Sequence, residues 1–304
     1  MSSPRKTNST LPESVMIFGC GYVGTALAEA LIGQGVRVGA LTRNSERAEA
    51  LRGAGLAEVL VADLDGVDWV HVLSGTYTSV VNCVSSAGGG LEGYRKSYVE
   101  GQKRILEWAQ KQSLSRFVYT SSSSVYPQDG GAQVDESADT SGAPPTGQVL
   151  LESERLIEAH AHLYDAWYVL RLSGIYGPGR QFLLKQLREG QGTIPGRGDY
   201  HMNMIHRDDA VSAILAALAG AGLSGVYNIC DDEPATKEKV ISEFAECLGL
   251  PVPGFDPENI PPRLQRRGGR MPDRLISNQK ARTQLGWTPI YPTFREGYAA
   301  LLEG

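Results

Sequence analysis

The chain has 304 residues, of which 41% are hydrophobic and 21% charged, and its formal net charge is −5. This composition is typical of a globular protein, and the acidic balance provides no long-range field that would gather nucleic acid. The four cysteines are scattered and form no CxxC pair, which argues against a metal site or a disulfide framework and favours a reducing compartment such as the cytoplasm. They are Cys20, Cys83, Cys230 and Cys247.

The sequence contains no apolar run close to the roughly 20 residues that would be needed to cross a bilayer. Residues 1–13 are polar and contain Pro4 and Pro12. Because they lack the apolar segment of a signal peptide, we interpret them as a flexible tail. The expected partner is therefore a small molecule, and neither a nucleic acid nor a membrane is expected.

Short apolar runs that end in glycine or polar residues predict buried strands along the first half of the chain. The predicted strands are 15–18, 36–41, 59–62, 79–84, 116–120 and 167–171. Helical patterns separate several of them, and these are 23–33, 94–111 and 148–163. Strands that alternate with helices of this length predict an α/β fold, with a doubly wound parallel sheet of the Rossmann type.

The alternation breaks after about residue 172, where glycine and proline become frequent. We therefore assign residues 14–172 to a Rossmann domain and residues 173–304 mostly to a smaller substrate lobe. The segment 203–230 is expected to return to the main sheet, because it contains a predicted helix, 208–219, followed by a predicted strand, 226–229.

A glycine loop follows the first predicted strand and precedes an amphipathic helix, which is the context that a dinucleotide-binding loop requires. Gly19 would allow the tight turn, Gly21 the approach of a pyrophosphate and Gly24 close packing of helix and strand. The backbone N–H groups of Tyr22 and Val23 would then face the phosphates at the start of the helix. The alternative is a glycine-rich turn that binds no ligand.

The choice of cofactor is usually set at the end of the second strand, where an acidic residue favours NAD. This sequence has Thr42 and Arg43 at that place. An arginine can pair with the 2′-phosphate of NADP through charge-assisted hydrogen bonds, so NADP is the expected cofactor and NAD the alternative. Arg43 could equally be a solvated loop residue.

Several stretches resemble the extended short-chain dehydrogenase/reductase family, which includes the nucleotide-sugar epimerases and dehydratases. The resemblance covers about residues 14–301, although Phe18 stands where typical members have glycine. The stretches that carry it are 18–24, 119–127, 171–180, 205–210, 227–229 and 285–289. The resemblance also implies further cofactor contacts, from Asp63, Leu64, Cys83, Val84, Ser85, Thr120 and Ser121.

The chemistry of that family requires a serine or threonine, a tyrosine and a lysine. Ser122 matches the serine, but Thr146 stands at the tyrosine position and Leu150 at the lysine position. No lysine occurs between Lys111 and Lys185, so a small shift of the alignment restores no motif. A threonine hydroxyl is a far weaker acid than a phenol, and leucine supplies no charge. The chain therefore resembles an atypical branch of the family in which the usual proton relay is lost.

Other side chains are candidates for the chemistry of the cleft. Tyr98 stands where the family has an asparagine and is a candidate acid, with a packing role as the alternative. Tyr126 and Tyr176 match positions that border nicotinamide or substrate in the family, and Arg180 and Arg207 are candidate anchors for an anionic substrate. The basic cluster 263–274 could be a solvated face or could bind a phosphate or carboxylate.

Two functions remain open at this point. One is an NADP-dependent oxidoreductase or epimerase/dehydratase-like enzyme, acting on a small carbonyl, alcohol or sugar-like substrate with a non-standard relay. The other is a catalytically inactive NADP(H)-binding sensor or interaction module. A purely structural role agrees poorly with the glycine loop. The oligomeric state is open, although a four-helix homodimer is common in the family.

Overall fold

A computed structural model describes residues 10–86, 88–190, 192–220, 222–260 and 271–302. Its centre is a seven-stranded sheet in the order β12-β7-β5-β4-β1-β2-β3, in which every pairing is parallel. The strands are β1 (Ser14–Phe18), β2 (Arg37–Thr42), β3 (Glu58–Val61), β4 (Ser79–Asn82), β5 (Leu114–Ser122), β7 (Tyr164–Leu172) and β12 (Gly225–Ile229). The order reverses between β1 and β4, which makes this a doubly wound Rossmann sheet, as the sequence predicts.

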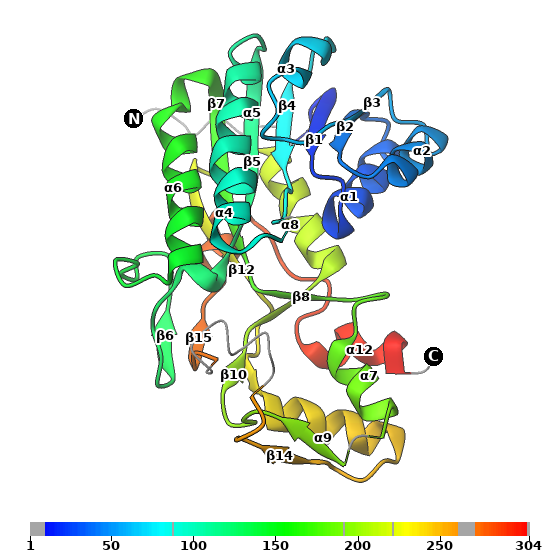
Figure 1. Cartoon of the computed structure of the whole chain (residues 1–304), viewed down its shortest axis with the longest axis vertical. Helices are drawn as coiled ribbons and strands as arrows, with labels where there is room; N and C mark the ends of the chain where they lie inside the picture. Colours follow the sequence, from blue (N-terminus) through cyan, green and yellow to red (C-terminus); the bar gives the residue numbers. More distant parts are fainter. Residues whose placement is uncertain (1–9, 87, 191, 221, 261–270, 303–304) are drawn as a thin grey trace, which may run out of the picture.

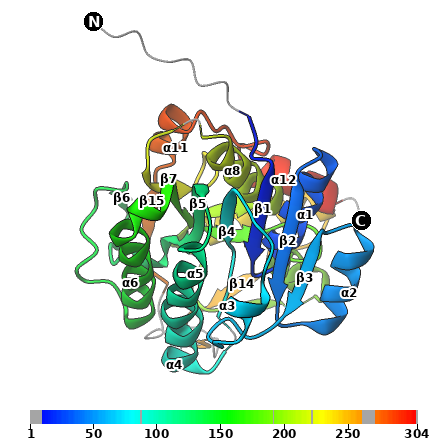
Figure 2. The ribbon, with the colours of Figure 1, turned by 90° about the horizontal axis from the view of Figure 1, so that it is seen from above.

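Helices cover both faces of the sheet, as Figures 1 and 2 show. One layer contains α1 (Tyr22–Gly33), α2 (Ser45–Gly53), α8 (Arg207–Ala219) and α11 (Gln279–Gln284). The other contains α3 (Trp69–Val72), α4 (Gly90–Arg95), the π-helical turn η1 (Lys96–Glu100), α5 (Gly101–Ala109) and α6 (Pro145–Ala159). Each layer encloses an apolar core of its own, one around Leu27 and Ile214 and one around Phe18 and Trp108.

Two predicted helices begin earlier than the hydrophobic pattern indicates. The segment 94–111 is preceded by α4 and interrupted by η1, so the chain is helical from Gly90 to Ala109 with a π turn in the middle. The predicted helix 148–163 begins at Pro145, because proline is well suited to the first position of a helix. After α6 ends at Ala159, only the short 3-10 turn η3 (Ala161–Leu163) continues it.

A second lobe lies beyond the carboxyl ends of the strands, in the lower half of Figure 1. It is built around the apolar core that joins α7 (Phe182–Arg188), α9 (Lys237–Leu248) and α12 (Phe294–Leu302). Its short strands are β6 (Ala132–Val134), β8 (Gly174–Tyr176), β9 (Thr193–Pro195), β10 (His201–Met202), β11 (Met204–His206), β13 (Ala235–Thr236), β14 (Gly254–Asp256) and β15 (Arg274–Ile276).

The segment 207–229 crosses back from this lobe. Helix α8 packs on α1, and β12 pairs in parallel with β7 at the edge of the main sheet. Two stretches singled out in the sequence, residues 1–9 and most of the basic cluster, 261–270, lie outside the described residues. Within the described residues, no helix combines the length and apolar character that crossing a bilayer would require.

Candidate cofactor and active site

The glycine loop between β1 and α1 packs closely against the end of β4. Gly19 has a φ of +88°, which favours glycine, and its N–H donates to the Leu41 carbonyl oxygen at 3.0 Å. A Cβ at Gly19 would lie 2.7 Å from the Val84 Cα, and a Cβ at Gly24 would lie 2.5 Å from the Gly19 carbonyl oxygen. A side chain at either glycine would therefore force the loop away from the sheet or its helix.

The space in front of Gly21 is open by contrast. Gly21 is the N-cap residue of α1, and no side chain caps the helix there. A Cβ at Gly21 would meet one heavy atom within 4 Å, Nη1 of Arg47 at 3.9 Å. The first N–H groups of an α-helix have no partner within the helix. The loop therefore fits a pyrophosphate that accepts hydrogen bonds from the amides of Tyr22 and Val23.

Two arginines lie beside this loop at the carboxyl end of β2. Arg43 is exposed, directly after the buried Thr42, whose Oγ1 accepts a hydrogen bond from the Asn44 N–H at 3.3 Å. Asn44 caps α2 by accepting from the Arg47 N–H at 2.7 Å. Nη1 of Arg47 then donates to the Cys20 carbonyl oxygen at 3.1 Å. Sequence reasoning missed Arg47, because its approach to the loop depends on how the β2–α2 turn folds.

The further residues implied for the cofactor lie at the ends of β3 and β4. Asp63 and Ser85 are exposed. Leu64 is buried instead, and it fills the space next to Gly101, where a Cβ would lie 2.6 Å from the leucine Cδ2. Burial raises the pKa of the Cys83 thiol to about 12, so this group remains protonated and supplies packing rather than charge.

The serine-rich end of β5 places three hydroxyl groups in different surroundings. Thr120 Oγ1 donates to the Asn82 carbonyl oxygen at 3.2 Å, and Ser121 Oγ donates to Glu154 Oε1 at 2.6 Å. Ser122 is only partly buried, and its Oγ accepts a hydrogen bond from the Ser124 N–H at 3.2 Å. An accepted bond orients the Ser122 hydroxyl and leaves its hydrogen available for a ligand oxygen.

Helix α6 carries the two positions at which the family's tyrosine and lysine are expected. Thr146 lies in its first turn and is partly exposed. Leu150 is 2% exposed and packs into an apolar cluster that includes Val125, Tyr126 and Ile276. This side of the helix therefore offers a weakly acidic hydroxyl and an aliphatic packing residue, and neither can act as a proton relay with the cofactor ribose.

Tyr98 lies in η1 and packs against the same apolar cluster as Leu150. Its phenol oxygen accepts a hydrogen bond from the Ser86 N–H at 3.2 Å, and its ring lies 5.1 Å from that of Tyr94. Desolvation, followed by the neighbouring Tyr94, raises the pKa of Tyr98 to about 12. A phenol with so high a pKa is a poor proton donor near neutral pH, so Tyr98 can orient a ligand more readily than it can protonate one.

Tyr126 and Tyr176 are both buried side chains with partners inside the protein. Tyr126 is 1% exposed, and its hydroxyl accepts from Arg171 Nη1 at 2.9 Å and donates to Asn228 Oδ1 at 2.7 Å. Tyr176 is also buried, and its ring stacks on that of Tyr298 at 4.4 Å in the core of the second lobe. Both side chains are therefore held by contacts within the protein, and their expected place beside nicotinamide or substrate stays a prediction.

Arg180 and Arg207 flank the ring of Tyr22. Each guanidinium carbon lies 5.4 Å from the ring centroid, within the range of a cation–π contact. The Tyr22 hydroxyl donates to the Pro178 carbonyl oxygen at 3.0 Å, and Arg207 pairs with Asp208 at 2.8 Å. The side chain of Tyr22 thus joins the glycine loop to the second lobe, while its amide faces the expected pyrophosphate.

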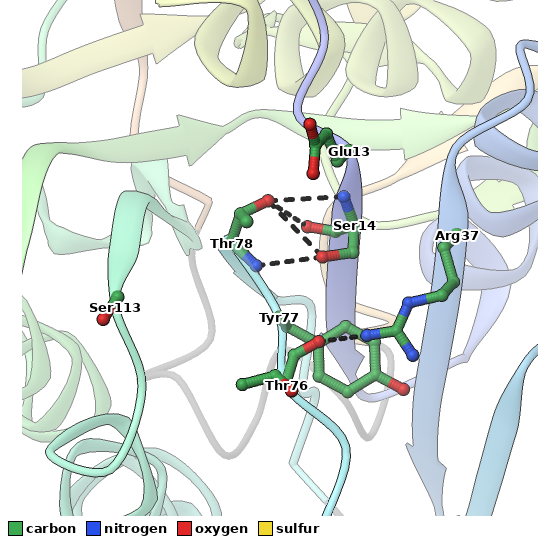
Figure 3. A pocket seen from close by; sticks show the side chains of 7 residues that line it. All are labelled: Glu13, Ser14, Arg37, Thr76, Tyr77, Thr78 and Ser113. Atoms are coloured by element: carbon green, nitrogen blue, oxygen red, sulfur yellow. Dashed lines mark hydrogen bonds between the residues drawn. The ribbon is translucent and has the colours of Figure 1, made fainter.

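Two cavities contain no residue of the glycine loop in their lining. One, of about 420 Å³, is lined by Glu13, Ser14, Arg37, Thr76, Tyr77, Thr78 and Ser113. Figure 3 shows its Ser14–Thr78 hydrogen bonds, at the amino ends of β1 and β4. Ligands of open α/β sheets bind beyond the carboxyl ends of the strands, so this cavity is not part of the cofactor site. The other, of about 560 Å³, lies against α7 in the second lobe.

Comparison with known proteins agrees with this geometry. Residues 15–230 match the model of the NAD dependent epimerase/dehydratase family. The chain belongs to that family. The family resemblance inferred from the sequence is thereby confirmed, and the chain belongs to an NAD(P)-dependent family.

Several known proteins are similar to this epimerase/dehydratase-family chain over most of its length. The 3-diazoavenalumate denitrifying reductase of a Streptomyces species is 30% identical, over 91% of this chain and 96% of its own length. Protein YeeZ of Escherichia coli K12 is 26% identical, over 92% and 97%. The solved structure of MoeE5 with UDP-glucuronic acid and NAD is 25% identical and covers 95% of this chain and 98% of its own, with a TM-score of 0.79.

Proposed function

We propose that this protein is an NADPH-dependent reductase that delivers hydride to an electrophilic centre whose reduction needs no phenolic proton donor. The proposal rests on a contrast between the cofactor loop and helix α6 within the candidate site. The glycine loop retains a cradle for the pyrophosphate, whereas Leu150 is buried in a hydrophobic cluster at the lysine position. The protein has kept the means to hold the cofactor and lost the means to protonate an alkoxide.

Some substrates can be reduced without the proton donor that the protein lacks. NADPH, when bound, supplies a hydride at the nicotinamide ring. Reduction of a carbonyl then leaves an oxyanion that requires a proton, which is the task of the family's tyrosine. A carbon that bears a leaving group requires none, because the electron pair of the breaking bond departs with that group. Ser122 would orient such a substrate by donating its free hydroxyl hydrogen.

The name of one relative supports this class of substrate. The protein at 30% identity is a denitrifying reductase of a diazo compound, so its reaction removes nitrogen from carbon during a reduction. When such a group is present as an aryl diazonium cation, hydride forms the new C–H bond while the C–N bond breaks, and N₂ leaves with the electron pair of that bond, so no proton is needed. We extend this class of reaction, reductive replacement of a leaving group, to the chain described here.

The preference for NADPH over NADH forms part of the proposal. Arg43 and Arg47 both lie at the start of α2, where the adenosine ribose of a Rossmann cofactor is expected. No acidic residue occupies the end of β2, and two guanidinium groups can form charge-assisted hydrogen bonds with a 2′-phosphate.

A hydride-transfer assay tests the function. Purified protein would be mixed with NADPH carrying deuterium at the nicotinamide C4, together with aryl diazonium salts or matched aryl aldehydes and ketones. We expect deuterium in the product from the diazonium salts, faster than without protein, and little from the carbonyl compounds. Faster reduction of the carbonyl compounds would contradict the proposal that the protein acts on substrates with a leaving group and lacks a proton donor. Tight NADPH binding with no transfer to any substrate would favour the sensor function instead.

A further inference from the structure

One residue, Arg180, both lines the cavity against α7 and lies close to the glycine loop. Arg180 lines this cavity of about 560 Å³, and the same side chain lies 5.4 Å from the ring of Tyr22 in the glycine loop. A volume of this size suits a small organic molecule. In Figure 1 the chain that leads into α7 passes below the helices of the cofactor domain.

Positive charge dominates the lining of this cavity. Arg180, Lys185 and Arg188 are the cations, and Glu189 is the single carboxylate among the lining residues. Glu189 lies 3.6 Å from Lys185 in an exposed i,i+4 pair, which holds little free energy. Arg188 donates to the carbonyl oxygens of Leu301 and Leu302. No carboxylate among the described residues lies within ion-pair distance of Arg180, so its charge is available to an anion.

The cavity also offers an aromatic face. Phe182 is the first residue of α7 and is 69% exposed, in contrast to Leu183 and Leu184, which are buried in the lobe core. A phenylalanine is seldom left so exposed beside a cavity that has cations on its rim. A planar ligand could stack on this ring while its charged end reaches Arg180.

A short strand connects the cavity with the proposed reaction centre. Ser173 Oγ donates to Ser123 Oγ at 3.4 Å, next to Ser122, and β8 then runs from Gly174 to Tyr176. The turn Gly177–Arg180 follows at once. Three extended residues span roughly 10 Å, so one short strand and its turn separate Arg180 from the end of β5 along the chain.

From these features we infer that the substrate of this protein is a planar organic carboxylate, anchored by Arg180 and Lys185 with its ring packed on Phe182. The inference rests on the proposed reductase function, because it names the substrate class for the same site. It adds a recognition element that the epimerase/dehydratase chemistry does not require, and it explains why the second lobe carries an unpaired arginine beside an exposed aromatic ring.

Direct binding tests this inference without any turnover. Cinnamate, its uncharged amide and the non-planar 3-cyclohexylpropionate would be titrated calorimetrically into the full chain, with and without NADP⁺. We expect cinnamate to bind at least about tenfold more tightly than either of the other two, since it alone combines charge with a flat ring. The substitutions Arg180→Gln, Lys185→Gln and Phe182→Ala would each weaken its binding several-fold.

Lys111→Gln provides the matched control, since it removes one exposed lysine charge at the far end of α5. Cinnamate binding that is equal in all variants would overturn the assigned location. Equal binding of cinnamate and its amide, or binding of UDP-glucuronic acid in place of cinnamate, would overturn the substrate class. This titration measures binding and no turnover, so it can fail while hydride transfer to an aryl diazonium salt that lacks a carboxylate persists, or the reverse.

Discussion

The two halves of the carboxyl edge of the sheet are built on different principles. Around β1 and α1, backbone atoms contact backbone atoms: a Cβ at Gly24 would lie 2.5 Å from a carbonyl oxygen. Around β5 and α6, side chains hold one another in place, as in the buried pair of Glu154 and Arg171 at 2.7 Å. The first half has the close backbone packing of a dinucleotide-binding loop, whereas the second is held by side-chain packing, with Leu150 at the position where we expect the family's lysine.

This difference indicates which parts of a site can change. A glycine loop tolerates few substitutions, because the ligand and the chain share the same narrow space. A catalytic pair on a helix can be replaced once the substrate no longer needs its proton, provided that the helix remains packed. Leu150 illustrates this, since it fills an apolar cluster where a lysine would have to be charged. The experiments below test this contrast between the two halves.

The largest effect is expected in the packed half. The substitution Glu154→Gln would leave Arg171 charged and buried with a weaker partner, at a cost of about 3–5 kcal/mol in the free energy of unfolding. The matched control is Glu152→Gln on the same helix, whose pair with Arg95 is exposed, so its loss should change the free energy of unfolding little. Chemical denaturation would measure both. Similar losses for the two variants would show that α6 is not held by its buried pair.

The next effect concerns the glycine loop. The substitution Gly24→Ala places a methyl group against the Gly19 carbonyl, so we expect a loss of about 1–3 kcal/mol in stability together with loss of dinucleotide binding. Gly33→Ala is the control, because a Cβ there meets nothing within 4 Å and an alanine favours the helix. If Gly24→Ala bound NADPH normally, the close packing of the loop would be irrelevant to its function.

A pH dependence is expected from the segment that follows β12. Burial, and then the charges of Asp232 and Glu233, raise the pKa of Asp231 to about 8. The folded protein therefore binds more protons than the unfolded chain between about pH 4 and pH 8, so this group's contribution to stability falls as the pH rises through that range. We expect the unfolding free energy to fall by at least about 1 kcal/mol by pH 8, a change that Asp231→Asn abolishes. An equal pH profile for both proteins would contradict this assignment.

The smallest effect concerns the choice of cofactor. Arg43→Glu should lower the affinity for NADPH about tenfold, through loss of a charge-assisted bond, and should leave NADH binding unchanged or slightly tighter. Parallel titrations with the two nucleotides measure the ratio, with NADH as the internal control. Equal affinities of the unaltered protein for NADPH and NADH would remove the role assigned to Arg43.

The features that could be predicted from the sequence are local ones. The strands of the main sheet and the glycine loop each depend on a few neighbouring residues, whereas the loss of the catalytic pair stays a prediction. Tyr126 could not be placed in this way, because its hydroxyl bonds to Asn228, 102 positions away along the chain. Arg47 could not be assigned to the loop from the sequence for a similar reason, because its contact with Cys20 spans 27 positions and requires the folded β2–α2 turn.

The binding of a pyrophosphate in front of Gly21 is the claim on which the account depends, and Gly21→Ala tests it most directly. The added methyl group would meet only Arg47 at 3.9 Å within the protein, so the thermal unfolding midpoint should be nearly unchanged. The same methyl group would occupy the space of the phosphates, so the affinity for NADPH should fall at least about tenfold. An unaltered affinity in a normally folded variant would show that the dinucleotide does not bind there.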